Sequence, residues 1–188
     1  PNYHPFRWRG WWAFGTGALG DMGCHLLDPP FRVLGLGSPT EVECSVGSVF
    51  LKDWTPEYIP EGCPPSSMVN LKFNASPTNK SPVDLTWYDG GLRPKRPAGI
   101  GPNEILGDAD GTNGVIMIGT KGIMTCGVYG ANPKIYKNGK QVPETELPVS
   151  TLPKVIDGVF GHHTQWVKAI KAGFGNGVLS SSLDYAGP

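Results

Sequence analysis

The sequence lacks a net charge, a long apolar run and a paired-cysteine motif. Sixteen Lys and Arg residues balance sixteen Asp and Glu residues, so no excess charge would attract nucleic acid or an anionic membrane. No stretch approaches the roughly 18 uninterrupted apolar residues of a membrane-spanning helix. The four cysteines stand far apart, without a CxxC pair, which argues against a zinc knuckle or a dense disulfide framework. We therefore expect free thiols, no metal, and neither nucleic acid nor a membrane as partner.

The sequence also lacks an initial Met and a basic, apolar leader, since it begins at Pro1. We expect a piece of a longer protein whose targeting signal the sequence does not show. Glycine and proline are abundant instead, with 27 and 19 residues among 188. Because six Trp, six Tyr and seven Phe accompany them, a loop-rich folded domain is favoured over disorder. The length suits one domain over residues 1–188.

The apolar pattern places a run of strands between two helical ends. Val42, Cys44 and Val46 alternate with polar residues, the pattern of a strand buried on one face. Pro29 and Pro30 interrupt the first helical pattern, so a kink or a restart is expected there. Strands without interleaved helices argue for an α+β fold with a largely antiparallel sheet. Expected are helices over 21–36 and 162–172, strands over 40–51, 67–75, 83–88, 114–119 and 122–128, a small hairpin over 135–142, and loops over 52–65 and 89–112.

A Gly-x-Gly-x-x-Gly motif runs from Gly15 to Gly20, and Glu41 or Glu43 follows about 20 residues later, as in a dinucleotide-binding fingerprint. The context argues against that interpretation. The preceding run, Phe6 to Phe14, is rich in Trp and Arg, where the fingerprint needs a buried Val/Ile-rich strand, and no βαβ units follow. We therefore expect no Rossmann domain in this chain. The glycines are expected to let the backbone approach a ligand and to lead into a helix.

Asp21 and His25 stand four residues apart, so on a helix they share one face. A carboxylate beside an imidazole fixes its tautomer and raises its basicity, as acid/base catalysis near neutral pH requires. The simpler alternative is an Asp that caps a helix and an unrelated His. The surroundings favour a sugar site, because aromatic faces stack on sugar C–H groups and guanidinium groups bind hydroxyls or carboxylates. The candidate substrate-binding residues of this region are Trp8, Arg9, Trp12 and Asp28.

His162 and His163 open the last predicted helix. They are candidates for contact with substrate hydroxyls or with an acidic sugar. The alternative is a polar helix start, with one His as a cap and the other solvated. A zinc site with His25 is disfavoured, because no ligand spacing supports it.

The segment WRGWWAFGTGALGDMGCHLLDPPFRVLGLGSPTEVE resembles the start of the C-terminal domain of the Gfo/Idh/MocA oxidoreductases, named for glucose–fructose oxidoreductase and inositol dehydrogenase. Asp21, His25 and Asp28 match the Asp-x-x-x-His-x-x-Asp pattern of that family. The segments DLTWYDGGLRP, GVIMIGTKGIMTCGVYG and GHHTQWVKAIKAG resemble its branch in environmental and gut bacteria. The resemblance thus covers nearly the whole chain.

The resemblance implies an open sheet of about five to eight strands with helices on one face, which pairs subunits through the sheet into a homo-oligomer. It also implies that His25 takes the proton from a sugar hydroxyl, with Asp21 as its partner, while hydride passes to NAD or NADP. The cofactor would be bound mainly by the chain's own N-terminal Rossmann domain. That domain, with its Glu-Lys-Pro motif, is not in this sequence, so the fragment alone is expected to be inactive. The parent would be cytoplasmic or periplasmic.

Three functions remain open at this stage. The first is an NAD(P)-dependent oxidoreductase that acts on a sugar, polyol or glycoside. The second is a redox-assisted, NAD-dependent glycosidase, in which transient oxidation acidifies a neighbouring C–H and permits elimination. The third is a non-enzymatic carbohydrate-binding or dimerisation domain. The sequence gives neither the sugar nor the choice between NAD and NADP.

Overall fold

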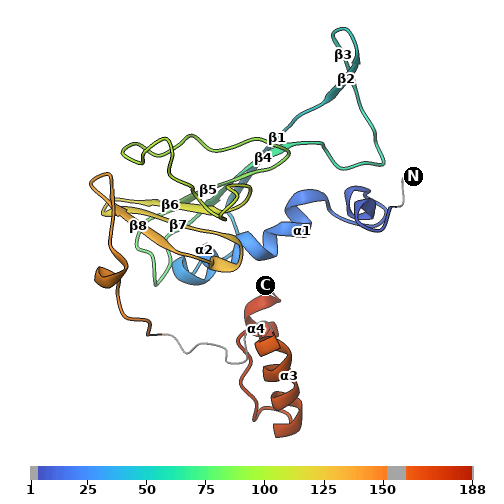
Figure 1. Ribbon diagram of the computed structural model, residues 1–188. Coiled ribbons are helices and arrows are strands. Elements are labelled where there is room, and N and C mark those ends of the chain that lie inside the picture. Colours follow the sequence, from blue (N-terminus) through green and yellow to red (C-terminus); the bar gives the residue numbers. More distant parts are fainter. Residues whose placement is uncertain (1–3, 152–159, 188) are drawn as a thin grey trace. The chain divides into compact units, whose positions relative to one another are not determined.

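The computed structural model describes residues 4–151 and 160–187. The chain forms two compact units, residues 1–144 and residues 145–188. Their grouping into one domain over residues 1–188 stays a prediction. Within the described residues the fold is a mixed one, with several antiparallel sheets and four α-helices and without a closed barrel (Figure 1). The predicted α+β class agrees with this architecture.

Two short helices replace the single kinked helix that the sequence predicts over 21–36. Helix α1 spans Gly17–Leu26 and helix α2 spans Asp28–Leu34, with the break at Leu27. The two prolines lie in the first turn of α2, where a missing backbone N–H costs no hydrogen bond. At the other end Gly35, with φ of 60°, ends α2 in the left-handed conformation that favours glycine. The predicted restart at the proline pair is therefore confirmed, one residue earlier than the prolines themselves.

The strands of the first unit pair only with antiparallel neighbours, as predicted, but the described strands form three sheets instead of one. One sheet has the order β1-β4-β5, a hairpin joins β2 to β3, and a third sheet has the order β6-β7-β8-β9. The long Gly/Pro-rich segment between β5 and β6 carries the chain from the first sheet to the third. The bounds are β1 Glu41–Val46, β2 Val49–Lys52, β3 Thr55–Glu57, β4 Ser67–Phe73, β5 Val83–Tyr88, β6 Val115–Gly119, β7 Gly122–Cys126, β8 Lys134–Lys137 and β9 Lys140–Gln141.

The segment that follows α2 differs most from its prediction. A single half-buried strand was expected over 40–51, followed by a loop over 52–65. Instead β1 ends at Val46, and β2 and β3 form a separate hairpin whose turn holds Trp54 at a φ of 60°. All six residues of β1 are exposed, so the expected burial of its apolar side chains is wrong. The physical reason is that the helices pack over the neighbouring strands β4 and β5 and leave β1 uncovered.

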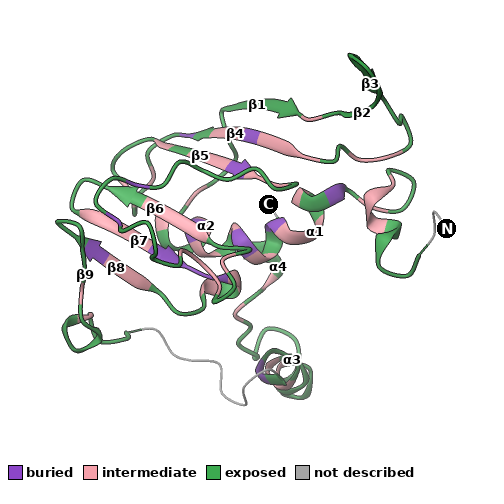
Figure 2. Ribbon diagram, turned by 45° about the horizontal axis from the view of Figure 1, so that its top comes forward, coloured by how far each residue is buried: buried purple, intermediate pink, exposed green. Residues whose placement is uncertain are grey.

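The core of the first unit lies between α1 and the β4–β5 pair. Leu26 of α1 packs with Val69 of β4 and Trp87 of β5, and all three are buried (Figure 2). Burial of each such side chain contributes about 1.5–3 kcal/mol. Phe31 of α2 adds an edge-to-face contact with Phe73. The apolar face of β4 and β5 therefore holds both helices in place, which fixes the position of α1 and its polar side chains.

In the second unit, helix α3 spans Gly161–Ala172, close to the predicted range. The side-chain oxygen of Gln165 accepts hydrogen bonds from the backbone N–H and the hydroxyl of Ser180. These bonds hold the chain that leads to the short helix α4, Leu183–Ala186, which the sequence did not predict. None of the helices in the described part of the chain has the length and apolar character that a membrane crossing requires.

Candidate functional site

His25 lies in the last turn of α1 and is partly exposed. Its Nδ1 is 3.5 Å from the sulfur of Cys24, a contact whose donor depends on the imidazole tautomer. Its ring also meets the ring of Tyr129 edge to face, with centroids 4.8 Å apart at an angle of 63°. The imidazole is thus held from two sides, by its neighbour on the helix and by an aromatic ring from another element.

Tyr129 belongs to the short 3-10 turn η2, Val128–Gly130, which follows β7. Its backbone adopts φ of 61°, an unusual and strained conformation for a bulky residue, and its side chain is 75% exposed. Asp108 anchors this turn, because its carboxylate accepts a hydrogen bond of 3.0 Å from the Val128 N–H. Sequence reasoning missed Tyr129, since the surrounding Gly-rich segment signalled only a turn. The strained turn places an exposed aromatic ring beside the candidate acid/base.

Asp21 has a different partner from the one that the sequence suggested. Both oxygens of its carboxylate accept hydrogen bonds from Nη1 of Arg9, at 2.8 and 2.7 Å. Although Asp21 and His25 share a helix face, the guanidinium group of Arg9 reaches the carboxylate from the 3-10 turn η1, Arg7–Gly10. The direct contact of Asp21 with His25 is therefore replaced by an ion pair that ties η1 to α1.

The guanidinium group of Arg9 also lies over two aromatic rings. Its guanidinium carbon lies 4.5 Å from the ring centroid of Phe6 and 5.5 Å from that of Trp8. Such cation–π contacts add to the ion pair and hold the guanidinium in a fixed plane. The predicted role of Arg9 in binding substrate thus competes with a structural role, because its charge is already balanced by Asp21.

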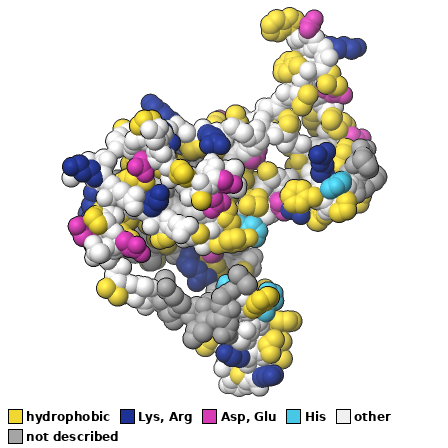
Figure 3. Space-filling model, viewed as in Figure 1, with side chains coloured by type: hydrophobic (Ala, Val, Ile, Leu, Met, Phe, Trp, Pro, Cys, Tyr) yellow, Lys and Arg dark blue, Asp and Glu magenta, His cyan; other side chains and the backbone are white. Residues whose placement is uncertain are grey.

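The aromatic N-terminal segment leaves two of its predicted sugar-binding rings accessible. Trp8 and Trp12 are both exposed, and apolar side chains gather over this segment in the space-filling view (Figure 3). The Trp12 N–H donates to the carbonyl of Glu61, and the Cys63 N–H donates to the carbonyl of Gly10. These bonds hold the segment against residues 61–63, so the exposed rings stand on a fixed backbone.

The glycine motif has a packing explanation. A Cβ on Gly15 would lie 2.5 Å from the Arg9 carbonyl oxygen, and one on Gly20 would clash with the side chain of Thr16. Gly17 has φ of 70° and lies against Cys63. The residues before the motif form η1 and a turn, where a dinucleotide fold needs a strand. The segment before the motif therefore differs from the strand that precedes a dinucleotide-binding loop.

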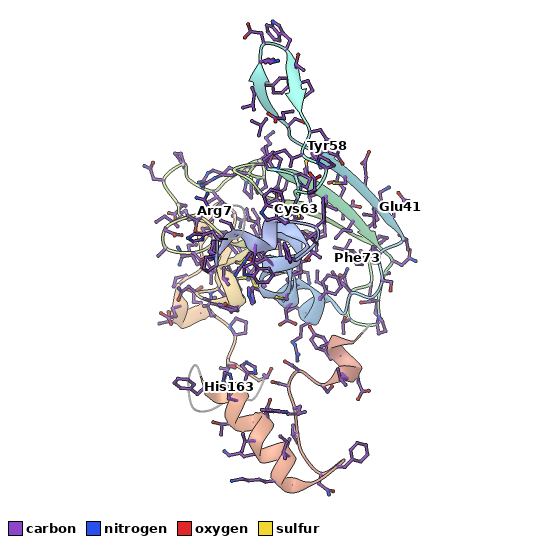
Figure 4. All side chains as sticks on the ribbon, turned by 90° about the vertical axis from the view of Figure 1, so that its right-hand side faces the viewer. Arg7, Glu41, Tyr58, Cys63, Phe73 and His163 are labelled. Carbon is purple, nitrogen blue, oxygen red and sulfur yellow. The ribbon has the colours of Figure 1, made fainter. Side chains whose placement is uncertain are left out.

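The remaining predicted site residues belong to α2 and to the second unit. Asp28 is exposed in the first turn of α2. His162 and His163 open α3 of the second unit, and the ring of His163 lies 6.2 Å from that of Phe160 (Figure 4). Their contribution to a site with His25 stays a prediction, as does that of Asp28.

The first unit also contains a hollow away from the predicted site residues. It has a volume of about 320 Å³, lies between the turns of the third sheet near Ile100, Lys121 and Tyr136, and contains none of the predicted site residues.

Two cysteine thiols of the first unit have raised pKa values. Burial raises the pKa of the Cys126 thiol, and the charge of Asp108 raises it further. Burial also raises the pKa of the Cys63 thiol. Among the described residues no group of three His, Cys, Asp or Glu side chains converges as a metal site would need.

A comparison of the sequence with models of protein families finds no match, and a comparison with curated proteins finds none either. The resemblance to the Gfo/Idh/MocA oxidoreductases therefore rests on the quoted sequence segments alone.

Proposed function

We propose that this chain is the substrate-binding and catalytic part of an NAD(P)-dependent oxidoreductase that acts on a sugar, polyol or glycoside, with His25 as its acid/base. The observation that carries the proposal is the setting of His25. Its imidazole is partly exposed on α1 and is held by Cys24 at Nδ1 and by the ring of Tyr129. A positioned imidazole is suited to transfer a proton to or from a sugar hydroxyl. An exposed aromatic ring beside it is suited to stack on the bound sugar.

The proposal assigns one step to this chain. With Nδ1 turned to Cys24, His25 takes the proton of a substrate hydroxyl at Nε2, which makes the imidazole a cation for the duration of the step. Tyr129 supplies an aromatic surface on which the C–H groups of a sugar ring stack. Asp21 holds η1 against α1 through its ion pair with Arg9. NAD or NADP would be bound mainly by a separate N-terminal domain of the parent protein, as the resemblance implies.

The same proposal includes the finer fold, the C-terminal domain of a Gfo/Idh/MocA oxidoreductase. The redox-assisted glycosidase would use His25 in the same way, so the two differ only in their products. Aryl glycosides separate them, because a glycosidase releases phenol without net accumulation of reduced nicotinamide, whereas a dehydrogenase accumulates it.

The exposed rings of Trp8 and Trp12 support a second candidate, a carbohydrate-binding domain without catalysis. The test uses the polypeptide that includes any domain encoded before Pro1. This polypeptide is incubated with NAD or NADP and with each member of a panel of sugars and polyols, and the formation of reduced nicotinamide is measured by its absorbance. Sugar binding without turnover, with His25→Gln binding as tightly as the wild type, favours the non-catalytic candidate. Turnover that falls in His25→Gln and persists in the surface control Lys168→Ala supports the oxidoreductase.

A further inference from the structure

The thiol of Cys24 has two polar contacts and a single proton. Its sulfur donates to the backbone carbonyl oxygen of Asp21, at 3.7 Å, and lies 3.5 Å from Nδ1 of His25. A thiol is both a weak donor and a weak acceptor, so both contacts can be hydrogen bonds at the same time. Because the thiol has only one proton, this condition decides which atom donates in each contact.

One arrangement of protons satisfies both contacts. The thiol proton is directed at the Asp21 carbonyl, and the sulfur accepts a hydrogen bond from a protonated Nδ1 of His25. A carbonyl oxygen has two lone pairs, so that of Asp21 can accept from the thiol as well as within the helix. In the opposite arrangement the thiol donates to an unprotonated Nδ1, and the bond to the carbonyl is lost. The arrangement with two hydrogen bonds leaves the Nε2 of the neutral imidazole unprotonated.

Asp21 does not compete with the thiol for the imidazole. The hydrogen bond at one ring nitrogen determines which nitrogen carries the proton, but both carboxylate oxygens of Asp21 accept from Arg9. Within the part of the chain that the structure describes, the ring of His25 makes no hydrogen bond other than that with Cys24. Tyr129 contributes a ring contact, which opposes rotation of the imidazole away from the thiol. The choice of tautomer therefore falls to Cys24.

We propose that Cys24 is a positioning residue that holds the neutral imidazole of His25 in the Nδ1–H tautomer and so leaves Nε2 free to accept a proton. This inference deepens the proposed function, and its meaning for catalysis rests on that function. A general base must present an unprotonated nitrogen to the substrate hydroxyl. In free histidine the Nε2–H tautomer predominates, which has no lone pair at Nε2. When Nε2 takes the hydroxyl proton, Nδ1 keeps its own, so the bond to sulfur persists through the step.

Nitrogen NMR of the imidazoles tests the tautomer without any substrate. In the chain with ¹⁵N-labelled histidine, at a pH that keeps the imidazoles neutral, long-range ¹H–¹⁵N correlations distinguish protonated from unprotonated ring nitrogens. The signals of His25 are those that His25→Gln removes. We expect a protonated Nδ1 in the wild type and a predominantly protonated Nε2 in Cys24→Ala. The matched control is Cys44→Ala, which changes the other exposed cysteine and should keep the wild-type spectrum. A wild type with its proton at Nε2, or an Nδ1–H tautomer that persists in Cys24→Ala, overturns the proposal.

Turnover of the parent polypeptide gives the second readout. In Cys24→Ala, kcat should fall about three- to tenfold with KM unchanged, because only the fraction of molecules with an unprotonated Nε2 reacts. An unchanged kcat in Cys24→Ala, together with a fall in His25→Gln, overturns the role of the thiol in the reaction. If the tautomer changes as expected but His25→Gln turns over as fast as the wild type, the proposed function fails and the assignment of the tautomer to Cys24 stands.

Discussion

At the scale of single residues, the ion pair of Asp21 and Arg9 is the feature that the structure adds to the candidate site. Both side chains are about one-third exposed, so solvent screens the pair and its coupling is expected to be about 0.5–1 kcal/mol. A double-mutant cycle with Asp21→Asn and Arg9→Met, followed by urea unfolding, measures that coupling. The pair Lys72–Glu41 is the control, because both side chains are largely exposed and its coupling should be too small to detect. Additive effects of the Asp21 and Arg9 changes would contradict the structural role of the pair.

The left-handed backbone of Tyr129 makes a second prediction. An alanine at this position keeps the strain of a positive φ, whereas a glycine adopts the same conformation freely. Tyr129→Gly should therefore be more stable to unfolding than Tyr129→Ala by about 1 kcal/mol. Chemical denaturation of the two variants tests it, and an alanine variant as stable as the glycine variant would argue against the strained turn.

The Cys126 thiol gives stability a dependence on pH. Its pKa in the folded protein is raised above the ordinary value of 9.0 by burial and by the charge of Asp108. As the pH rises above 9.0, the unfolded chain releases this proton before the folded chain does. The contribution is thus fully present below pH 9 and is lost as the pH passes the raised pKa. The melting temperature should fall less steeply between neutral and alkaline pH in Cys126→Ala than in the wild type, and equal slopes would refute the assignment.

At the scale of elements, the packing of α1 on β4 and β5 determines where His25 stands. Leu26 is buried in that contact, so Leu26→Ala is expected to lower the free energy of unfolding by about 2–4 kcal/mol. Val33→Ala is the matched control, because Val33 of α2 is exposed and its truncation should stay within about 0.5 kcal/mol. Guanidinium unfolding followed by tryptophan fluorescence distinguishes the two, and equal losses would place the core elsewhere.

The sequence predicted elements with a strong local signal and missed those that depend on distant contacts. The strands β4 and β5, the hairpin of β6 and β7, and helix α3 carry clear apolar periodicity, and the structure contains each of them. The alternation of β1 also predicted a strand, but no local pattern shows which strands the helices will cover. Its burial was therefore predicted wrongly, and so was the single sheet.

In the candidate site too, the sequence predicted what depends on local spacing and missed what depends on distant contacts. The proximity of Asp21 and His25 on one helix face follows from their spacing, and the structure places both on α1. Tyr129 reaches His25 from about 100 residues later, and the partnership of Arg9 with Asp21 depends on how η1 folds back. Neither contact has a signature in sequence spacing, because both arise from tertiary packing.

At the scale of the whole molecule, we propose that His25 is the acid/base of an oxidoreductase whose nucleotide would be bound by another domain of the same parent protein. A general base contributes about 10²–10⁴-fold to the rate of such a step. The most direct measurement is the rate of nicotinamide reduction by the parent polypeptide with its preferred sugar or polyol, for the wild type and for His25→Gln. The account predicts a fall of at least about 100-fold with the fold intact by circular dichroism. Turnover by His25→Gln equal to that of the wild type would contradict it.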